Sequence, residues 1–450
     1  MAKNMTEGNP MRLMLQFALP LLGGNLLQQT YNIADAAIVG RTLGADALAS
    51  VGASSSVQFL VLGFCIGICC GFGIPVSRYF GAQQPEKMRR YLFNAAVLTA
   101  GIGVVVTIAT ALLCPEILRL LSTPDDIFAD AYRYLFVIFM GIPATLLYNF
   151  LASMLRSVGD SRTPFLFLAF STVLNIALDL FCIVTLDWGV SGAAIATVAS
   201  QAASGVLCLL FIRKRVSLLH LTGEACRLER HVCKKLLLMG VPMGLQYSIT
   251  AIGSMVMQAA NNGLGSVYVS GFTAGMKLKQ FFLCPFDALS TAVSVFCSQN
   301  LGANQAKRMW EGLKKGLLIG VAYGVLAGAI LILGGRTLSL LFVDAEASAV
   351  LDASAQYVGC MGYFFWLLGI LNVCRMATQG IGFAGRTVFS GVAEMAARSA
   401  VSLLLVGRYG YTVICWTDQA AWLAACLYLV PMTLLSMKTV TKEVQKRLNG

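Results

Sequence analysis

Two aspartates lie in stretches of the sequence that are otherwise largely apolar. The segment from Arg162 to Asp179 begins in a polar turn and then stays apolar over a length that can span a bilayer. Asn175 lies four residues before Asp179, so the two side chains share one face of a helix. A carboxylate at bilayer depth costs roughly 2.5–3.5 kcal/mol on insertion scales, and it therefore needs a partner or water. The comparable acid in the first half of the chain is Asp35. The sequence therefore predicts a scaffold that holds two carboxylates with a cation between them.

The composition indicates that helices crossing a membrane position these acids. The chain has 450 residues, of which 57% are hydrophobic and 12% charged, whereas soluble proteins carry about 25% charged residues. Long uncharged runs recur, and closed β-barrels would show short alternating segments instead. The fold class predicted is an all-α polytopic membrane protein. We expect twelve transmembrane helices, at about residues 13–38, 47–77, 90–114, 130–154, 163–186, 189–212, 236–260, 268–300, 315–335, 350–374, 387–407 and 415–437.

Charge and cysteine patterns exclude several other classes of protein. The net charge of +12 is spread over short loops and does not gather on one face, which argues against nucleic-acid binding. The basic residues concentrate in alternate loops, so both termini are expected to be cytoplasmic, in the plasma (cell inner) membrane. The fourteen cysteines show no metal-ligand spacing. The sequence contains no metalloprotease or serine-hydrolase motif, so we predict a protein that is not an enzyme and has no cofactor.

The sequence repeats itself once. The motif at residues 81–88 reappears at 302–309, the turn at 159–163 is echoed at 382–387, and the Pro20 region matches that of Pro242. Each half contains six predicted spans, so we expect two parallel repeats with a substrate site between them. The predicted domains are an N-lobe at 1–212, a cytoplasmic linker at 213–235, a C-lobe at 236–437 and a basic tail at 438–450. The linker holds both histidines, His220 and His231, which we interpret as solvated rather than pH-sensing.

These features resemble the multidrug and toxic compound extrusion (MATE) family of the multidrug/oligosaccharidyl-lipid/polysaccharide flippase superfamily over nearly the whole chain. Each motif alone is weak, but their order and spacing over twelve spans are specific. The motifs are Ala18-Leu19-Pro20, Asp35-Ala36-Ala37-Ile38-Val39-Gly40, Gly81-Ala82-Gln83, Gly159-Asp160-Ser161-Arg162-Thr163-Pro164, Gly189 to Thr197, and Gly302-Ala303.

The resemblance implies two six-helix lobes around a central cleft, with alternating access driven by sodium ions or protons. It places the cation-coupling site at Asp35, Asn175, Asp179 and Thr197, of which only Thr197 comes from the resemblance alone. Carboxylate, amide and hydroxyl oxygens suit a hard cation such as Na⁺, and the same carboxylates can hold a proton. The sequence leaves the choice of ion open. A purely structural role, bridging helices, is the alternative reading.

The second half departs from one branch of the family. Gln246 stands where that branch places an acid on the seventh helix, and the tenth span contains no acid. Lys277, Lys279 and Asp287 lie on the eighth predicted helix. Glu394 and Arg398 lie four residues apart on the eleventh, and we interpret them as a self-neutralising structural pair. The residues predicted to line the substrate cleft are Gln28, Tyr31, Gln246, Met257, Phe282 and Asp287.

The leading functional hypothesis is a secondary active antiporter that exports amphipathic or cationic drugs in exchange for Na⁺ or H⁺. Its expected partners are small organic cations and the lipid bilayer, without nucleic acid, and we expect a monomer. The alternative is a flippase for a lipid-linked saccharide or another lipid. That function favours arginines lining the cleft to meet pyrophosphate, and the spans of the first half show acids instead.

Overall fold

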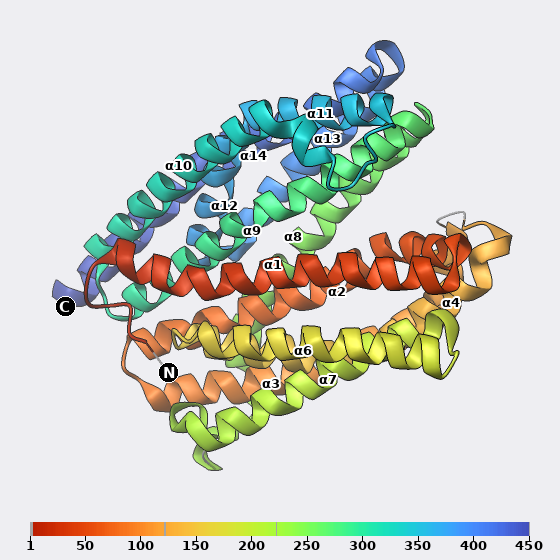
Figure 1. Cartoon of the computed structure of the whole chain (residues 1–450). Coiled ribbons are helices and arrows are strands. Elements are labelled where there is room, and N and C mark those ends of the chain that lie inside the picture. Colours follow the sequence, from red (N-terminus) through yellow and green to blue (C-terminus); the bar gives the residue numbers. More distant parts are fainter. Residues whose placement is uncertain (1–2, 121–122, 222, 450) are drawn as a thin grey trace. The chain divides into compact units, whose positions relative to one another are not determined.

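The computed structural model describes residues 3–120, 123–221 and 223–449, and every regular element in these ranges is a helix (Figure 1). The first half contains α1 (Pro10–Leu43), α2 (Ala45–Gly81), α3 (Pro85–Leu120), α4 (Asp125–Met140), α5 (Ile142–Ser157), α6 (Arg162–Leu180), a π-helix (Phe181–Thr185) and α7 (Gly189–Arg215). Two short 3₁₀ turns follow, at Ser217–Leu219 and Gly223–Ala225. The second half contains α8 (Arg230–Asn262), α9 (Ser266–Gly302), α10 (Ala306–Ser339), α11 (Ser348–Tyr363), α12 (Phe365–Gly380), α13 (Ala384–Tyr409) and α14 (Tyr411–Asn449).

The predicted all-α membrane fold is confirmed. Within the described ranges, nine helices are long and apolar enough to cross a membrane, and two bent pairs raise that number to eleven. Eleven of the predicted spans coincide with these helices or pairs, the fifth ending one residue beyond Thr185, and the first predicted span lies in α1, which is not among them. That helix has 34 residues, about 50 Å at 1.5 Å per residue. It carries several amide side chains before Asp35, which interrupt its apolar stretch.

The fourth and tenth predicted spans are each broken. The axes of α4 and α5 differ by 45° at Gly141, and those of α11 and α12 by 58° at Phe364. Pro143 lies at the start of α5, so the first break agrees with the kink expected from its ring. No proline lies at the second break, so the prolines in the sequence do not predict it.

The backbone contains the internal repeat that the sequence predicts. Four pairs of residues have positive φ angles and lie 221 to 223 residues apart. Each pair occupies the same connection between helices in the two halves, where the chain turns in a conformation that few side chains other than glycine adopt readily. The pairs are Gly44 with Gly265, Gln83 with Asn304, Gly159 with Gly382, and Gly189 with Gly410.

The chain divides into two compact units. Unit 1 contains residues Met1–Asn4 and Gly23–Gly244, and unit 2 contains Met5–Leu22 and Leu245–Gly450. The boundaries inside α1 and α8 come shortly after Pro20 and Pro242, the equivalent prolines of the two halves. Each unit therefore includes a helical segment contributed by the other half of the sequence.

In unit 1, α2 packs closely against the first half of α8. A Cβ built at Gly71 would lie 2.6 Å from the Cα of Gly240, and one at Gly67 would lie 2.7 Å from the Cα of Gly244. Both helices thus present glycines four residues apart, the small-xxx-small pattern that lets membrane helices approach closely. Larger side chains at these positions would push the two helices apart.

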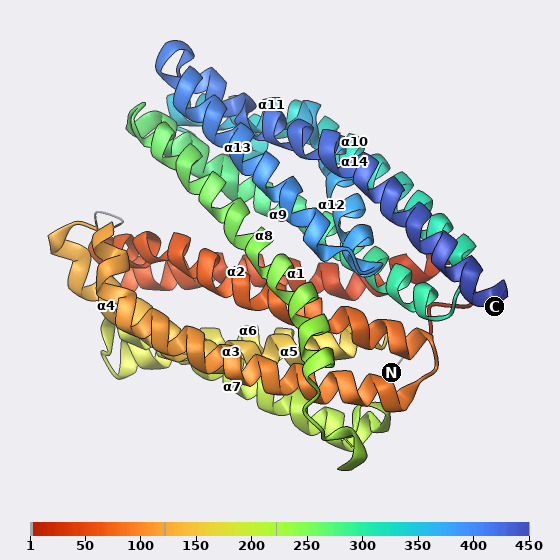
Figure 2. The same cartoon turned by 180° about the vertical axis from the view of Figure 1, so that it is seen from behind.

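In unit 2, aromatic side chains fill the centre of the core. Phe365 on α12 lies 5.3 Å from Phe286 on α9 and 6.3 Å from Trp422 on α14, between ring centroids. All three are almost fully buried. Figure 2 shows α13 and α14 side by side in this unit.

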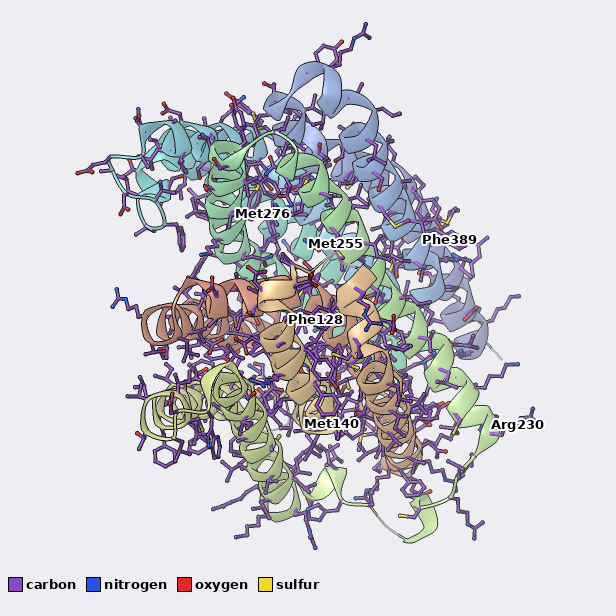
Figure 3. The ribbon with its side chains drawn as sticks, turned by 90° about the vertical axis from the view of Figure 1, so that its right-hand side faces the viewer. Phe128, Met140, Arg230, Met255, Met276 and Phe389 are labelled. Carbon is purple, nitrogen blue, oxygen red and sulfur yellow. The ribbon has the colours of Figure 1, made fainter. Side chains whose placement is uncertain are left out.

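Many large apolar side chains point outward, as the bilayer requires of lipid-facing surfaces. Phe389 projects from α13 (Figure 3) and is 61% exposed. Others with exposure above 70% are Leu112, Leu333, Leu341 and Leu404.

Candidate functional site

The start of α6 is fixed by a capping interaction. Oδ1 of Asp160 accepts hydrogen bonds from the backbone N–H groups of Arg162 and Thr163, at 3.1 and 3.0 Å, and Oδ2 accepts the Thr163 hydroxyl at 2.7 Å. Burial alone would raise the pKa of Asp160, but hydrogen bonds, those from Thr163 among them, outweigh burial and hold the pKa below its ordinary value. The carboxylate therefore satisfies N–H groups that the first turn of a helix leaves open.

From this start, α6 carries Asn175 and Asp179 on its buried face. Asn175 is 2% exposed and Asp179 is fully buried. Immediately after Asp179 the helix widens into the π-helix Phe181–Thr185, with the N–H of Leu186 donating to the carbonyl of Phe181. Such widened turns are frequent at functional sites.

The structure brings the four predicted cation-site residues together inside unit 1. The Asn175 amide nitrogen lies 3.4 Å from the Thr197 hydroxyl on α7. The Asp35 and Asp179 carboxyl groups lie close enough to interact, although no hydrogen bond of standard geometry joins them. Three helices, α1, α6 and α7, therefore supply the side chains. Their proximity is a finding, whereas their role in coupling stays a prediction.

The site is rich in acceptor oxygens that have no donor. Oδ1 of Asp35, Oδ1 of Asn175 and both carboxylate oxygens of Asp179 are buried without a hydrogen-bond partner among the described residues. Among the described residues, no ion pair involves Asp35 or Asp179. Buried polar atoms are ordinarily satisfied. Carboxylate, amide and hydroxyl oxygens in this arrangement fit a proton or a Na⁺ ion, because both need oxygen partners and neither needs a donor.

Sequence reasoning missed two neighbours of this site. Tyr134 on α4 is 5% exposed and lies near both carboxylates, and the side chain of Gln58 on α2 adjoins it. The Gln58 amide nitrogen is likewise buried without a partner. Each residue lies among other polar residues of its predicted span, Gln58 after Ser54, Ser55 and Ser56 and Tyr134 after Tyr132 and Arg133, so no sequence signal singles it out.

The residues predicted to line the substrate cleft occupy varied positions. In unit 1, Gln28 is exposed on α1, and the Tyr31 hydroxyl lies 3.0 Å from that of Thr197, beside the candidate cation site. The others lie in unit 2: Gln246 and Met257 on α8 are buried, Phe282 on α9 is partly buried, and Asp287 on α9 is exposed. The Gln246 side chain accepts hydrogen bonds from Gln379 and Thr387, at 2.6 and 3.2 Å. Their contact with substrate stays a prediction.

Unit 2 contains a buried network of charged side chains centred on Asp418 of α14. Its Oδ2 accepts hydrogen bonds from Lys279 Nζ at 2.5 Å and from the Tyr357 hydroxyl at 2.7 Å. Its Oδ1 accepts two bonds from Arg398, at 3.1 and 2.9 Å. Asp418 therefore has donors of the kind that Asp179 lacks among the residues that the structure describes.

The network extends beyond the pair predicted from the sequence. Glu394 does bond to Arg398, at 3.0 Å, but it also accepts a bond from Arg375 of α12 at 2.9 Å. The interpretation of Glu394 and Arg398 as a self-neutralising pair is therefore too narrow, since Arg398 is shared with Asp418. The missed signal was Asp418 itself, an acid inside the twelfth predicted span.

Comparisons with known proteins agree with this architecture. The MatE family profile matches residues 20–181 and 242–410, so it matches each half of the chain once. The probable multidrug resistance protein YpnP of Bacillus subtilis is 30% identical over 381 residues, which cover 85% of both chains. The multidrug export protein MepA of Staphylococcus aureus is 21% identical over 442 residues, covering 97% of this chain and 96% of that protein. The solved outward-facing structure of a multidrug resistance MATE transporter superposes with a TM-score of 0.90 at 19% identity, covering 97% of this chain and 98% of that one.

Proposed function

Because the chain belongs to the MatE family of multidrug efflux transporters, we propose that it is a secondary antiporter that exports amphipathic organic cations in exchange for Na⁺ or H⁺. The family's members are transporters and not enzymes. The observation that carries the proposal is the set of buried oxygens without donors at Asp35, Asn175 and Asp179. Two acids that have no basic partner among the described residues need a cation or a proton to offset the cost of burying them.

The ion site supplies the coupling. In this mechanism Asp35 and Asp179 alternate between holding the driving ion and standing ionised, and Thr197 and Asn175 orient the oxygens that receive it. Two unit charges about 4 Å apart repel by roughly 4 kcal/mol at an effective dielectric constant of 20, so simultaneous ionisation of both acids is costly. Occupancy by the ion relieves that repulsion and favours one conformation of the transporter. A bound cationic substrate favours the other.

Linkage between the two ligands follows from this scheme. If the driving ion and the substrate favour different conformations, each weakens the other's affinity by the same factor. Typical couplings are on the order of 1–3 kcal/mol, or roughly 5- to 150-fold in affinity. The transporter then exchanges one ligand for the other across the membrane by alternating between its two conformations. Gln28, Tyr31, Gln246, Met257, Phe282 and Asp287 remain our candidates for the substrate cleft.

The orientation in the membrane is part of the proposal. Lysine and arginine concentrate at the ends of α2 and α7, at the starts of α3 and α8, and in the last turns of α14. By the positive-inside rule these regions face the cytoplasm, together with both termini. We propose that the protein acts as a monomer in the cell inner membrane.

Binding of a fluorescent dye to the purified protein tests the proposal. Ethidium affinity is titrated against pH at fixed sodium, and against sodium at fixed pH and ionic strength. Antiport predicts weaker ethidium binding as the driving ion increases, and Asp179→Asn should flatten that dependence. Affinity indifferent to both ions would refute coupling. A lipid-linked pyrophosphate that binds more tightly than ethidium would favour the flippase alternative.

A further inference from the structure

The internal repeat allows the candidate ion site of unit 1 to be compared with its counterpart in unit 2. Gln58 lies between two pairs of turn residues that are both 221 apart, so its equivalent is Lys279. The breaks of the two bent pairs are 223 residues apart, which makes Tyr357 the equivalent of Tyr134. The stretch between the first two pairs of turn residues contains no insertion, and Tyr134 and Tyr357 each lie seven residues before their break, so these two matches do not depend on sequence similarity.

The remaining positions follow in the same way. Gly159 and Gly382 are 223 apart, so Asn175 matches Arg398, and Asp179 matches Ser402. The burial patterns of α6 and α13 agree with this register, since all four of these residues are buried. Gly189 and Gly410 are 221 apart, and they match Thr197 with Asp418.

The network around Asp418 is therefore the counterpart of the candidate ion site, but with altered charge. In unit 1 the positions hold polar side chains and an acid, with no basic group. In unit 2 the equivalent positions hold an ammonium, a guanidinium and one carboxylate, joined by direct hydrogen bonds. Unit 2 therefore carries basic side chains at positions where unit 1 has neutral polar side chains.

The buried network carries one more cation than anions. Three basic residues, Lys279, Arg375 and Arg398, are bonded to two carboxylates, Glu394 and Asp418. Arginine stays protonated in proteins, whereas the lysine ammonium can lose its proton. The surplus charge of the network therefore corresponds to the one proton that can leave, on Nζ of Lys279. An uncompensated charge in a buried cluster is costly, and loss of this proton would balance the two arginines with the two carboxylates.

The charged and aromatic side chains near Lys279 lie on four other helices, α11, α12, α13 and α14, and on α9 itself. Asp418 and, 5.5 Å from the ammonium, the ring of Trp422 lie on α14. Tyr357 comes from α11, Arg398 and Glu394 from α13, and Arg375 from α12. On α9 itself, Asp287 is an exposed electrostatic neighbour of Arg375, and no ion pair joins the two among the described residues. The lysine side chain keeps 9% of its surface exposed.

We propose that Lys279 and Asp418 form a second proton-transferring site, so that unit 2 exchanges a proton with water during the transport cycle. The inference rests on the proposed function, because the trigger is a cationic substrate. Its positive charge adds to a network that already has a surplus, and it displaces the proton. In that step one N–H bond of the ammonium breaks, the electron pair stays on Nζ, and water accepts the proton. The neutral amine still donates to Asp418, and the network of two arginines and two carboxylates is then neutral.

Counting protons tests the inference. Saturating ethidium is added to purified full-length protein in weakly buffered solution, and the protons released per bound dye are measured between about pH 6 and pH 9. Lys279→Arg keeps a cation and its hydrogen bonds but cannot deprotonate in this range. It should release about one proton fewer than the wild-type protein. Lys277→Arg is the matched control, because Lys277 is an exposed lysine on the same helix, and its count should equal that of the wild type.

Two results would overturn the inference. One is an unchanged proton count in Lys279→Arg or, if that larger side chain disturbs folding, in Lys279→Gln, which introduces the residue found at position 58. The other is the absence of proton release from a protein carrying both Asp35→Asn and Asp179→Asn, which leaves unit 2 intact. Failure of the proposed antiport looks different, since efflux of ethidium would then respond to no ion gradient even in the wild-type protein.

Discussion

The same substitution, aspartate to asparagine, should have opposite consequences at positions 179 and 418. Both aspartates are almost fully buried. Asp418 accepts four hydrogen bonds from three side chains, two of them cationic. Asp179 accepts none from the described residues. The first acid is therefore part of a completed network, whereas the second has oxygens available for a ligand.

The expected magnitudes follow from these contacts. Breaking a buried ion pair by removing one partner costs about 3–5 kcal/mol, because the other charge is left uncompensated. For a unit of this size, 1 kcal/mol shifts the melting temperature by about 2–4 °C. Asp418→Asn should therefore lower the melting temperature by roughly 6–20 °C. Asp179→Asn removes a charge that has no partner in the described part of the chain, so the melting temperature should stay unchanged or rise.

Two assays on the same preparations separate these effects. Thermal unfolding in detergent reports stability, and gradient-driven ethidium efflux from proteoliposomes reports coupling. We expect a stable Asp179→Asn protein without coupled efflux, and an unstable Asp418→Asn protein. The reasoning is refuted if Asp179→Asn is as destabilising as Asp418→Asn, because Asp179 would then have a structural partner. A neutral effect at position 418 would equally contradict the geometry of the network.

Three further substitutions test other parts of the account. Asp35→Asn should abolish coupled efflux, and combining it with Asp179→Asn should be no worse than either change alone if the two acids form one site; additive losses would indicate separate sites. Glu394→Gln should lower the melting temperature but impair transport less than Asp179→Asn, because it leaves two arginines undercompensated; a stable protein without transport would place coupling in unit 2. Asp160→Ala should cost about 1 kcal/mol through the lost cap of α6. Since the folded pKa of Asp160 is lowered, this contribution is present above the ordinary carboxyl pKa of about 4 and is lost as pH falls below it. The difference in melting temperature between wild type and variant should therefore shrink on acidification, and a constant difference would contradict the cap.

The positions of the membrane-spanning helices could be predicted from the sequence because bilayer thickness sets helix length. The twelve predicted spans correspond to the helices and bent pairs, and the repeat recurs in the backbone turns. Side-chain partners across helices are different, since no local pattern specifies them. The i,i+4 spacing of Glu394 and Arg398 identified that pair, yet Asp418 joins it from a helix twenty residues further along the chain. The bend between α11 and α12, at Phe364, contains no proline that would have predicted it.

The acids and the asparagine of the candidate ion site could be predicted from the sequence. An acid inside an apolar span is conspicuous, and Asn175 and Asp179 share a helical face by their spacing. Tyr134 and Gln58 are less conspicuous, because uncharged polar residues occur in many spans. Their proximity to the acids depends on how α2 and α4 pack around α7, which requires the structure.

Efflux of ethidium from proteoliposomes, with sodium and pH gradients imposed separately, tests the central claim most directly. We expect the wild-type protein to export ethidium when one of the two gradients is imposed, and not when neither is. We also expect Asp179→Asn to abolish this response while the protein remains folded. Efflux that is equally fast without either gradient, or a response that Asp179→Asn leaves intact, would contradict coupling through the buried acids of unit 1.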